Sequence, residues 1–394
     1  MRVVHINLTA RDGGTGRAVY GISQALEQNG YEGYTLFSSN EPSSKNEIKY
    51  ATPIRRRANA LISRILGNYG FDCHLITKRL IAKIKKLKPD VIHLHNLHGH
   101  NVNLNMLFGY FKKNPQIKLF WTFHDCWAFT GYCPHFDMVG CDKWKNGCGN
   151  CPQKKCYSWF FDKSKRLYEK KKQLFAGLNL TVITPSEWLA GLARQAYFKN
   201  YEIKVINNGV DLSAFNITDS DFREKYKLQD KKIVLGVAFG WDERKGLDCF
   251  IELSKRLPSD YQIVLVGTDE NVDKQLPSNI ISIHRTSNQI ELAKIYSASD
   301  VFVNCTREET FPTVNMEAIA CGTPIVTFKT GGSPEIIDNT CGSVVIKNDI
   351  EAMQKEIIRI CEEKPYSSEA CRKRAVDNFE QKTNFEKYIE MYLK

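Results

Sequence analysis

Two glutamates, Glu309 and Glu317, stand eight positions apart in the segment EETFPTVNMEAIACGTPIV, residues 308–326. The segment follows the apolar, strand-like run DVFVNC, and we expect a helix to begin near Pro312 or Thr313, because proline is tolerated in the first helical turn. The two carboxylates can form an acid/base pair, hold a ligand from two sides, or simply belong to an ordinary helix start. A helix rises about 1.5 Å per residue, so Glu317 lies roughly 6 Å or more beyond Glu309. We therefore interpret the pair as the two ends of a clasp around a sugar-nucleotide donor, whose diphosphate the first helical amides attract.

Arg244 and Lys245 form a cationic pair in the segment GWDERKGLD, after another apolar run and before a helical one. Two cations at such a position can offset the negative charge that builds on a departing diphosphate, which is how much phosphate chemistry is catalysed. The alternative is a solvated pair of surface charges. The first interpretation predicts that this segment and the Glu309 segment hold the same ligand.

Glycine and histidine segments supply further candidates in the first half of the chain. The loop GGTG, Gly13–Gly16, follows the first apolar run, and TFHD, Thr122–Asp125, places His124 after another. The run HLHNLHGH, residues 93–100, ends a strand with polar side chains, of which we single out His95, Asn96 and His98. Three interpretations stay open for this run: the lining of an acceptor site, structural histidines, or a metal site.

Six of the thirteen cysteines lie within residues 126–156. Cys148 and Cys151 form a CxxC pair, whose short spacing lets two thiolates face one tetrahedral metal, and Cys133 and Cys141 can supply two further ligands. The spacings of eight, seven and three positions differ from those of a standard zinc finger. A structural zinc on these four cysteines is therefore one interpretation, with possible substitutes in His135, Cys126 and Cys156. Reduced thiols and disulfides are the alternatives.

The elements that must position these residues alternate along the chain. Apolar strand-like runs are separated by segments of helical spacing, which predicts doubly wound parallel sheets of the α/β class, with ligands bound beyond the carboxyl ends of the strands. The alternation restarts after a polar stretch near residues 208–230, and 394 residues exceed the usual size of a single core. We expect a first domain at residues 1–210, a second at 211–375, and a C-terminal helix at 376–394 that crosses back to the first domain.

Positive charge is concentrated in the first half of the chain. Residues 1–200 hold 30 Lys or Arg and 13 Asp or Glu, a balance of +17, whereas residues 201–394 hold 25 and 31, a balance of −6, and the sum is +11. This asymmetry suggests an anionic partner such as phospholipid, a lipid diphosphate or nucleic acid. Because the sequence shows neither a membrane-spanning stretch nor a signal-peptide core, we expect a cytoplasmic protein.

Two basic segments, residues 53–70 and 75–89, have the spacing of amphipathic helices. Their apolar stripes can face the core or lie in an anionic membrane interface. The positive charge of the first half favours peripheral association with the inner face of the plasma membrane. The apolar face of the first segment consists of Ile54, Ala58, Leu61, Ile62, Ile65 and Leu66.

The segment that starts at Glu309 closely resembles the signature of the retaining glycosyltransferases of family 4. That signature is a Glu, seven residues, a second Glu, a small-residue stop and a GG-x-PE turn, which here is Gly331–Glu335. The resemblance extends over nearly the whole chain, because GGTG, TFHD, NNGVD and RTSNQIELAKIYSASDVFVN also look like family segments in order and spacing. It implies the GT-B fold, two Rossmann-like domains that face each other across a cleft, with a Cys-rich insert in the first. The insert itself resembles one found in capsule, O-antigen and colanic-acid glycosyltransferases.

The resemblance also implies roles for individual residues. The catalytic residues would be His124, Glu309 and Lys245, with Glu309 facing the donor sugar. Acceptor-side residues would be His95, Asn96 and His98. Donor-binding residues would be Gly13, Gly14, Arg244, Lys245, Arg285, Thr286, Phe311, Thr313, Val314 and Glu317, of which Glu317 would hold the ribose. Where the family usually has an arginine, this chain has Phe239 and Gly240, so either Arg244 substitutes or the phosphate is held with one cation fewer.

The resulting hypothesis is a retaining hexosyl- or related glycosyltransferase of bacterial surface polysaccharide synthesis. It would move a sugar from a UDP- or GDP-linked donor to a glycan acceptor carried on a lipid diphosphate. The family needs no catalytic metal, so zinc would serve only a structural role. A sugar-nucleotide epimerase of the same fold is one alternative. A zinc-stapled nucleic-acid-binding protein is the other, but it has no use for the donor motifs, and we expect no nucleic-acid partner.

Overall fold

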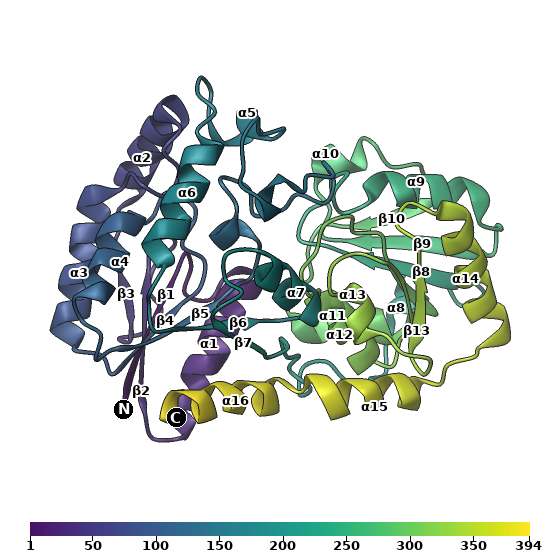
Figure 1. The fold of residues 1–394 in the computed structure, drawn as a ribbon. Helices are drawn as coiled ribbons and strands as arrows, with labels where there is room; N and C mark the ends of the chain where they lie inside the picture. The colour runs from purple at the N-terminus through teal and green to yellow at the C-terminus, as the bar shows by residue number, and fades with distance from the viewer. The chain divides into compact units, whose positions relative to one another are not determined.

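The computed structural model describes residues 1–394 and divides into two compact units. Unit 1 contains Met1–Asn207 together with Phe385–Lys394, and unit 2 contains Asn208–Asn384. The chain therefore changes unit at 207/208 and at 384/385, whereas the sequence predicted changes at 210/211 and 375/376. Each unit is a parallel sheet with helices on both faces (Figure 1).

Unit 1 is built on a seven-stranded sheet whose strand order is β3-β2-β1-β4-β5-β6-β7, and every neighbouring pair is parallel. The strands are β1 (Arg2–Asn7), β2 (Glu32–Phe37), β3 (Glu47–Lys49), β4 (Val91–Leu94), β5 (Lys118–Thr122), β6 (Leu180–Thr184) and β7 (Glu202–Val205). The helices are α1 (Gly13–Gln28), α2 (Pro53–Leu66), α3 (His74–Leu87), α4 (Leu104–Lys112), α5 (Lys154–Tyr157), α6 (Ser164–Phe175) and α7 (Glu187–Gln195), and two short 3-10 turns lie at Trp127–Phe129 and Lys143–Lys145.

Unit 2 is built on a six-stranded sheet with the order β10-β9-β8-β11-β12-β13, again parallel throughout. Its strands are β8 (Lys232–Val237), β9 (Tyr261–Val266), β10 (Ile280–Ile283), β11 (Val301–Asn304), β12 (Ile325–Phe328) and β13 (Gly342–Val345). Its helices are α8 (Phe222–Lys225), α9 (Leu247–Arg256), α10 (Glu270–Asp273), α11 (Gln289–Ser297), α12 (Thr313–Ala320), α13 (Ser333–Ile336), α14 (Ile350–Glu363) and α15 (Ser368–Phe379).

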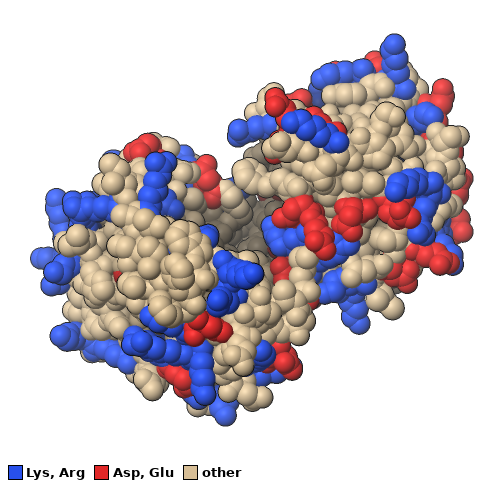
Figure 2. Space-filling view, turned by 90° about the horizontal axis from the view of Figure 1, so that it is seen from above, with Lys and Arg blue, Asp and Glu red and all other residues tan.

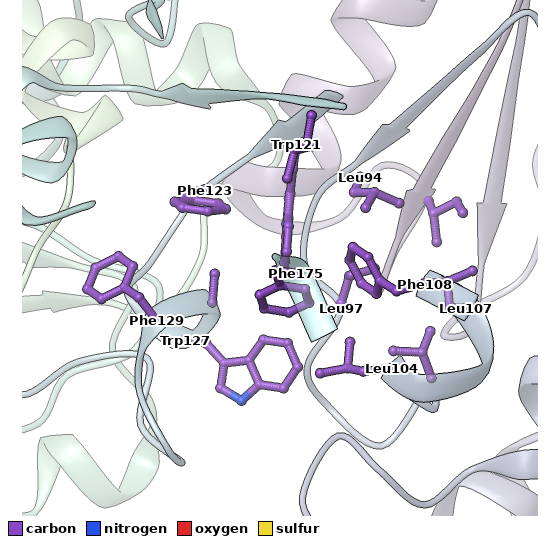
Figure 3. Packing of buried hydrophobic residues seen from close by; sticks show 14 of the residues in the cluster. Leu94, Leu97, Leu104, Leu107, Phe108, Trp121, Phe123, Trp127, Phe129 and Phe175 are labelled. Atoms are coloured by element: carbon purple, nitrogen blue, oxygen red, sulfur yellow. The ribbon is translucent and has the colours of Figure 1, made fainter. Parts of the chain in front are cut away.

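A large aromatic cluster fills the core of unit 1 beneath the loop that follows β5. Trp121 on β5 packs edge-on against Phe175 of α6 at a ring distance of 5.2 Å, and Phe108 of α4 lies 4.7 Å from the same ring (Figure 3). Trp127, from the 3-10 turn after β5, belongs to the same cluster. Because such rings bury large apolar areas, they hold the β5 loop firmly against the sheet.

The last helix, α16 (Gln381–Leu393), completes a second core of unit 1. Its apolar side chains pack with Val3 of β1 and Ile22 and Leu26 of α1. The hydroxyl of Tyr392 lies 2.5 Å from Nδ1 of His93 in β4, and both residues are fully buried. Residues far apart in the sequence therefore share one buried polar contact.

The surface charge follows the composition. In Figure 2 blue Lys and Arg side chains outnumber red Asp and Glu over unit 1, whereas the two colours mix over unit 2. None of the helices combines the length and the apolar character that crossing a bilayer requires.

Candidate active site

The carboxyl ends of β8 and β11 are neighbours in the sheet of unit 2, and the two loops that leave them carry the predicted chemistry. Lys245 Nζ, from the β8 loop, lies 3.0 Å from Glu309 Oε2, from the β11 loop. Both side chains are about one-fifth exposed, so the ion pair is only partly screened by water. The sequence prediction that these two segments come together is therefore consistent with the geometry.

Arg307 ties the two loops to each other, a role that the sequence analysis missed. Its backbone N–H donates to the carbonyl of Arg244 at 2.8 Å, and its guanidinium pairs with Asp248 of α9 at 2.7 Å. The Asp248 carboxylate raises the pKa of Arg307 above its usual value. The bidentate ion pair and the backbone hydrogen bond together restrict the position of the β8 loop, and therefore the position of Lys245.

The glycine turn that follows β12 packs against the backbone of Glu309 and Thr310. Gly331 has a φ of 55°, and a Cβ atom there would stand 1.7 Å from the carbonyl oxygen of Glu309. The next amide, of Gly332, donates to the carbonyl of Thr310 at 3.0 Å. Only glycine allows both this left-handed backbone and this close approach, so the Gly-Gly pair of the turn is a support for the Glu309 backbone.

Helix α12 begins at Thr313, as expected, and its N-cap residue, Pro312, offers no side-chain cap to the first amides. No acidic side chain lies in the first turn either. Amides left without a side-chain partner at a helix start suit an anion. Glu317, one turn further, is 6% exposed and accepts a hydrogen bond from the buried Tyr296 hydroxyl at 3.3 Å, so it is not a solvated helix residue.

The other predicted donor residues lie less centrally. Arg244 forms its ion pair with Asp242 at 4.0 Å, so its side chain points differently from that of Lys245. The Phe311 ring is buried in the core of unit 2, which leaves only its backbone for a ligand. The exposed Arg285 and the half-buried Thr286 follow the edge strand β10, two strands away from β8.

Unit 1 gathers its candidates in the same way, at the carboxyl ends of β4 and β5. His98 Nε2 and Asp125 Oδ2 are 2.7 Å apart, and the other oxygen of Asp125 accepts from the amide of Trp127 at 2.8 Å. Although burial alone would raise the pKa of Asp125, the charge and hydrogen bond of His98 hold it at about 2. Asn96 donates to the Thr15 hydroxyl at 3.2 Å, which ties the β4 loop to the glycine loop.

A chain of hydrogen-bonded histidines runs inward from His124. His124 Nε2 lies 3.1 Å from His95 Nδ1, and His95 Nε2 lies 3.2 Å from His5 Nδ1, whose own Nε2 has no partner. Buried N–H groups without an acceptor are rarer than unpaired acceptors, so His5 carries its proton on Nδ1. Each neutral ring then donates from Nδ1 to the next, and His124 is left with its proton on Nδ1 and an accepting Nε2.

The same chain bears on two members of the histidine run, His93 and His95. His5, His93 and His95 are the only group of three or more His, Cys, Asp or Glu side chains whose ligand atoms lie within 4.8 Å of one another. Hydrogen bonds already occupy both ring nitrogens of His93 and of His95. These two are structural histidines, and His95, expected to line the acceptor site, is buried behind His124.

The glycine loop of unit 1 has free space where side chains would be. A Cβ atom on Gly13 or Gly14 would meet no atom within 4 Å, and Gly13 adopts a φ of 69°. Backbone strain accounts for Gly13, but nothing in the packing requires Gly14 to lack a side chain. The space beside Gly14 leaves room for a ligand at the start of α1.

Comparison with known proteins supports this geometry. The family model described as Glycosyltransferase Family 4 matches residues 12–214, and the one described as Glycosyl transferases group 1 matches residues 218–377. The chain belongs to glycosyltransferase family 4. It is therefore a glycosyltransferase, and its two parallel Rossmann-like units are those of the GT-B fold.

Relatives of this glycosyltransferase include the Escherichia coli K12 protein WcaC, assigned to colanic acid biosynthesis. The two are 23% identical over 366 residues, which cover 89% of this chain and 88% of WcaC. A 41.2 kDa protein from the cps region of Klebsiella pneumoniae is 24% identical, with coverage of 88% and 99%. Among solved structures, the sucrose-phosphate synthase of Thermosynechococcus elongatus superimposes with a TM-score of 0.74 at 20% identity over 100% of this chain and 98% of that one. Anabaena Alr3699/HepE in complex with UDP-glucose gives 0.70 at 14% identity, with 99% of each chain covered.

The cysteine-rich segment of this glycosyltransferase lies against the core of unit 1. All thirteen cysteines of the chain are free, so the segment holds no disulfide. Cys133 is buried, whereas Cys141, Cys148 and Cys151 are half-buried and pack against the same cluster. No three of their sulfur atoms lie within 4.8 Å of one another, so the four predicted zinc ligands do not form a closed shell as they stand.

The two basic helices of the glycosyltransferase differ in what covers them. On α3 the side chains of Ile76, Leu80 and Ile84 are buried, so this helix faces the core. On α2 only Ser63 is buried, and the core-facing interpretation is wrong for this helix. The apolar stripe predicted from the sequence of α2 is exposed. The neighbouring residues Trp159, Phe160 and Phe161, which the sequence analysis did not single out, extend it.

Proposed function

We propose that this glycosyltransferase moves a sugar, with retention of configuration, from a nucleoside-diphosphate sugar to a glycan acceptor of a surface polysaccharide. The main support for a nucleoside-diphosphate donor is the Lys245–Glu309 ion pair, which lies beside the start of α12, where no side chain caps the helix. In the proposal unit 2 binds the donor. The relative Alr3699/HepE, whose structure holds UDP-glucose, and the polysaccharide relatives support this donor and product class.

Each donor-side group has a distinct task in the proposed reaction. Lys245 and the first amides of α12 neutralise the diphosphate as negative charge develops on it. Glu309, held by Lys245, orients the donor sugar, and Glu317 accepts hydrogen bonds from the ribose hydroxyls. The amide of Thr310, which donates to Glu309 Oε1 at 3.0 Å, fixes the carboxylate for this task.

Retention is accounted for by attack from the face that the diphosphate leaves. The bond between the anomeric carbon and the diphosphate oxygen breaks, the acceptor oxygen bonds to that carbon, and the acceptor proton passes to the departing diphosphate. His124, which follows β5, positions the donor sugar or polarises an acceptor group. Burial lowers the pKa of His124 to about 4, so the ring is a neutral donor at neutral pH.

Thermal-shift measurements with UDP-, GDP- and ADP-sugars test the donor, because a ligand that binds only the folded state raises its stability. We expect one nucleotide class to shift the melting temperature, and expect Glu317→Gln to remove most of that shift. Incubation of the donor without acceptor separates the alternatives, since an epimerase converts the donor sugar under that condition and a transferase does not. Stereochemistry of the transferred sugar, read by proton NMR, tests retention.

The acceptor is proposed to be linked to a membrane lipid. The exposed stripe of α2 lies among arginines that make no ion pair, and Trp159 donates its amide to the carbonyl of Arg64 at 2.8 Å, which places the aromatic residues at the end of that helix. An apolar surface bordered by unpaired cations suits an anionic membrane interface. Peripheral association with the inner face of the plasma membrane is part of the proposal.

Structural zinc in the cysteine segment stays a prediction. The donor set suits zinc, and the amide of Gly131 donates to Cys148 Sγ at 3.2 Å, as amides do to metal-bound thiolates. Lys171, which is fully buried and donates to the carbonyls of Trp127 and Thr130, lies where it can offset the charge of thiolate ligands. The sulfur atoms would have to close in around the ion. Elemental analysis of protein purified without chelator tests this, and a zinc content near zero removes the prediction.

A further inference from the structure

A pocket of about 400 Å³, lined in part by charged side chains, opens at the carboxyl edge of the unit 1 sheet. Its walls come from the segment after β2, the segment after β4 and one face of α2. Ligands of parallel sheets bind at this edge, and the volume lies within the range of small-molecule sites. The side chains that give the pocket its character are Ser38, Ser39, Lys49, Arg56, Arg57 and His100.

The pocket carries an excess of positive charge. Lys49, Arg56 and Arg57 face one acid, Glu41, which pairs with Lys49 and is itself largely exposed, so the lining has a net charge of +2. Neither arginine forms an ion pair. Arg56 Nε is buried without any hydrogen-bond partner, which is unfavourable unless a ligand supplies the acceptor. Guanidinium groups match the geometry of phosphate oxygens.

A second donor type lines the same pocket. Burial, together with the charges of Arg64 and Arg56, lowers the pKa of His100 to about 4, so the ring is neutral at pH 7 and can donate one hydrogen bond. Cations and neutral donors together suit a phosphate, which accepts several hydrogen bonds at once.

The pocket adjoins the exposed apolar stripe through α2. Pro53, Arg56, Arg57 and Ala60 have the i, i+3, i+4, i+7 spacing of one helix face and line the pocket. Leu61 and Ile65 lie about 100° further around the helix and are 51% and 37% exposed. A molecule with a phosphate in the pocket can therefore lay a hydrocarbon chain along the neighbouring face of the same helix.

We propose that this pocket binds the phosphate or diphosphate group of a lipid-linked glycosyl acceptor, whose hydrocarbon chain lies on the exposed face of α2. The proposal rests on the proposed function, because it names the class of acceptor for that reaction. The net charge of the lining matches a diphosphate, and the apolar face requires a lipid rather than a free anion. Arg56 and Arg57 are the principal phosphate ligands.

Calorimetric titration with farnesyl diphosphate, inorganic pyrophosphate and farnesol tests the pocket. The titrations use full-length protein in a Lys245→Gln background, which weakens the diphosphate site proposed in unit 2. We expect farnesyl diphosphate to bind more tightly than pyrophosphate, and farnesol not to bind. Arg56→Gln and Arg57→Gln should each raise the Kd of farnesyl diphosphate at least tenfold. Arg55→Gln, which removes the same charge from the same helix outside the pocket, should change it less than twofold.

Three outcomes would overturn the proposal. An equal loss in Arg55→Gln indicates general attraction to a basic surface, unchanged binding in Arg56→Gln and Arg57→Gln excludes the pocket, and equal affinity for pyrophosphate and farnesyl diphosphate excludes the lipid. Arg57→Gln, at an exposed position, keeps the test valid if Arg56→Gln does not fold. Nucleotide-sugar binding, measured on protein with Lys245 intact, reports on unit 2, so failure of the pocket and failure of the proposed function are told apart.

Discussion

Glu309 and Glu317 differ in what holds them, and this difference assigns them different tasks. Glu309 is paired with a cation and supported by a glycine turn, whereas Glu317 is almost buried beside a tyrosine hydroxyl. Sequence spacing favoured separate tasks over a joint action on one bond. Their partners separate them further, since only the structure shows which carboxylate is paired with Lys245.

Glu309→Gln should abolish most of the transfer while nucleotide binding persists. The substitution keeps the side chain's shape but removes the charge that pairs with Lys245 and orients the donor sugar. We expect a fall in kcat of about 10²–10³, the usual cost of losing one transition-state contact, with a change in nucleotide Kd below fivefold. Glu243→Gln, an exposed acid in the loop that carries Lys245, is the matched control and should retain activity. Parallel losses in binding and turnover would contradict the assignment.

Glu317→Gln should act on nucleotide binding instead. A glutamine offers one acceptor where the carboxylate offers two, so the ribose is held less well, and we expect the nucleotide Kd to rise about tenfold, equivalent to about 1.4 kcal/mol. Titration calorimetry with the free nucleoside diphosphate measures it. Tyr296→Phe removes only the hydroxyl that donates to Glu317 and should give a smaller effect. An unchanged Kd in Glu317→Gln would rule out the ribose role.

At the scale of elements, the periodicity of apolar residues predicted which helices and strands form. It did not predict which of their faces are buried. The alternation of runs predicted both parallel sheets, and the helix that begins at Thr313 lies where the proline and the apolar spacing put it. The stripes of α2 and α3 look alike in sequence, yet one is buried and the other exposed. An amphipathic pattern reports that a stripe exists and carries no information on what covers it.

Removal of the aromatic residues beside α2 should weaken membrane binding. Trp159 and Phe160 are 48% and 64% exposed, and burial of such side chains contributes about 1.5–3 kcal/mol each. Trp159→Ala with Phe160→Ala should therefore lower partitioning onto vesicles of phosphatidylcholine and phosphatidylglycerol at least tenfold, as measured by co-sedimentation.

Phe239→Ala provides the control for this test, because Phe239 is fully exposed in unit 2. It should leave vesicle binding unchanged. Neutralisation of Arg55, Arg56 and Arg57 should also reduce binding, most strongly at low salt, because exposed charges act through screened electrostatics. Binding that survives both the aromatic and the arginine substitutions would contradict a membrane role for α2.

At the scale of the whole molecule, what the sequence could not predict is mostly contact between distant segments. His5 and His95 are ninety positions apart, and Tyr392 meets His93 from the far end of the chain. No local pattern encodes such pairs, because strand order brings them together. The family resemblance identified His124 and Lys245 as candidates. It did not predict the hydrogen-bonded histidines behind His124, or the contacts of Arg307 that hold the loop of Lys245.

The buried histidines should make folding stability depend on pH. Burial lowers the pKa of His5 to about 3 and that of His124 to about 4, and lowers those of His93 and His95 well below 6.5. Below pH 6.5 the unfolded chain therefore binds protons that the folded chain does not, and stability falls as the pH falls. Each fully buried ring contributes up to about 2 kcal/mol between pH 6.5 and 5.

Guanidinium denaturation at pH 7 and pH 5, followed by tryptophan fluorescence, measures this effect. The signal reports mainly on unit 1, whose tryptophans are Trp121, Trp127, Trp144, Trp159 and Trp188. We expect a lower midpoint at pH 5, and a smaller difference between the two pH values in His5→Leu, because that variant has one titrating ring fewer. A midpoint that is the same at both pH values would contradict neutral, buried rings.

The return of residues 385–394 to unit 1 has a consequence for biosynthesis. These residues are translated after the rest of unit 2, so the face of the unit 1 sheet around Val3 and His93 stays incompletely covered while unit 2 is synthesised. Unit 2 can reach its folded state first although it is encoded second. A nonsense mutation at codon 385, far from any proposed ligand contact, should therefore leave an aggregation-prone unit 1 and a folded unit 2 on the same chain.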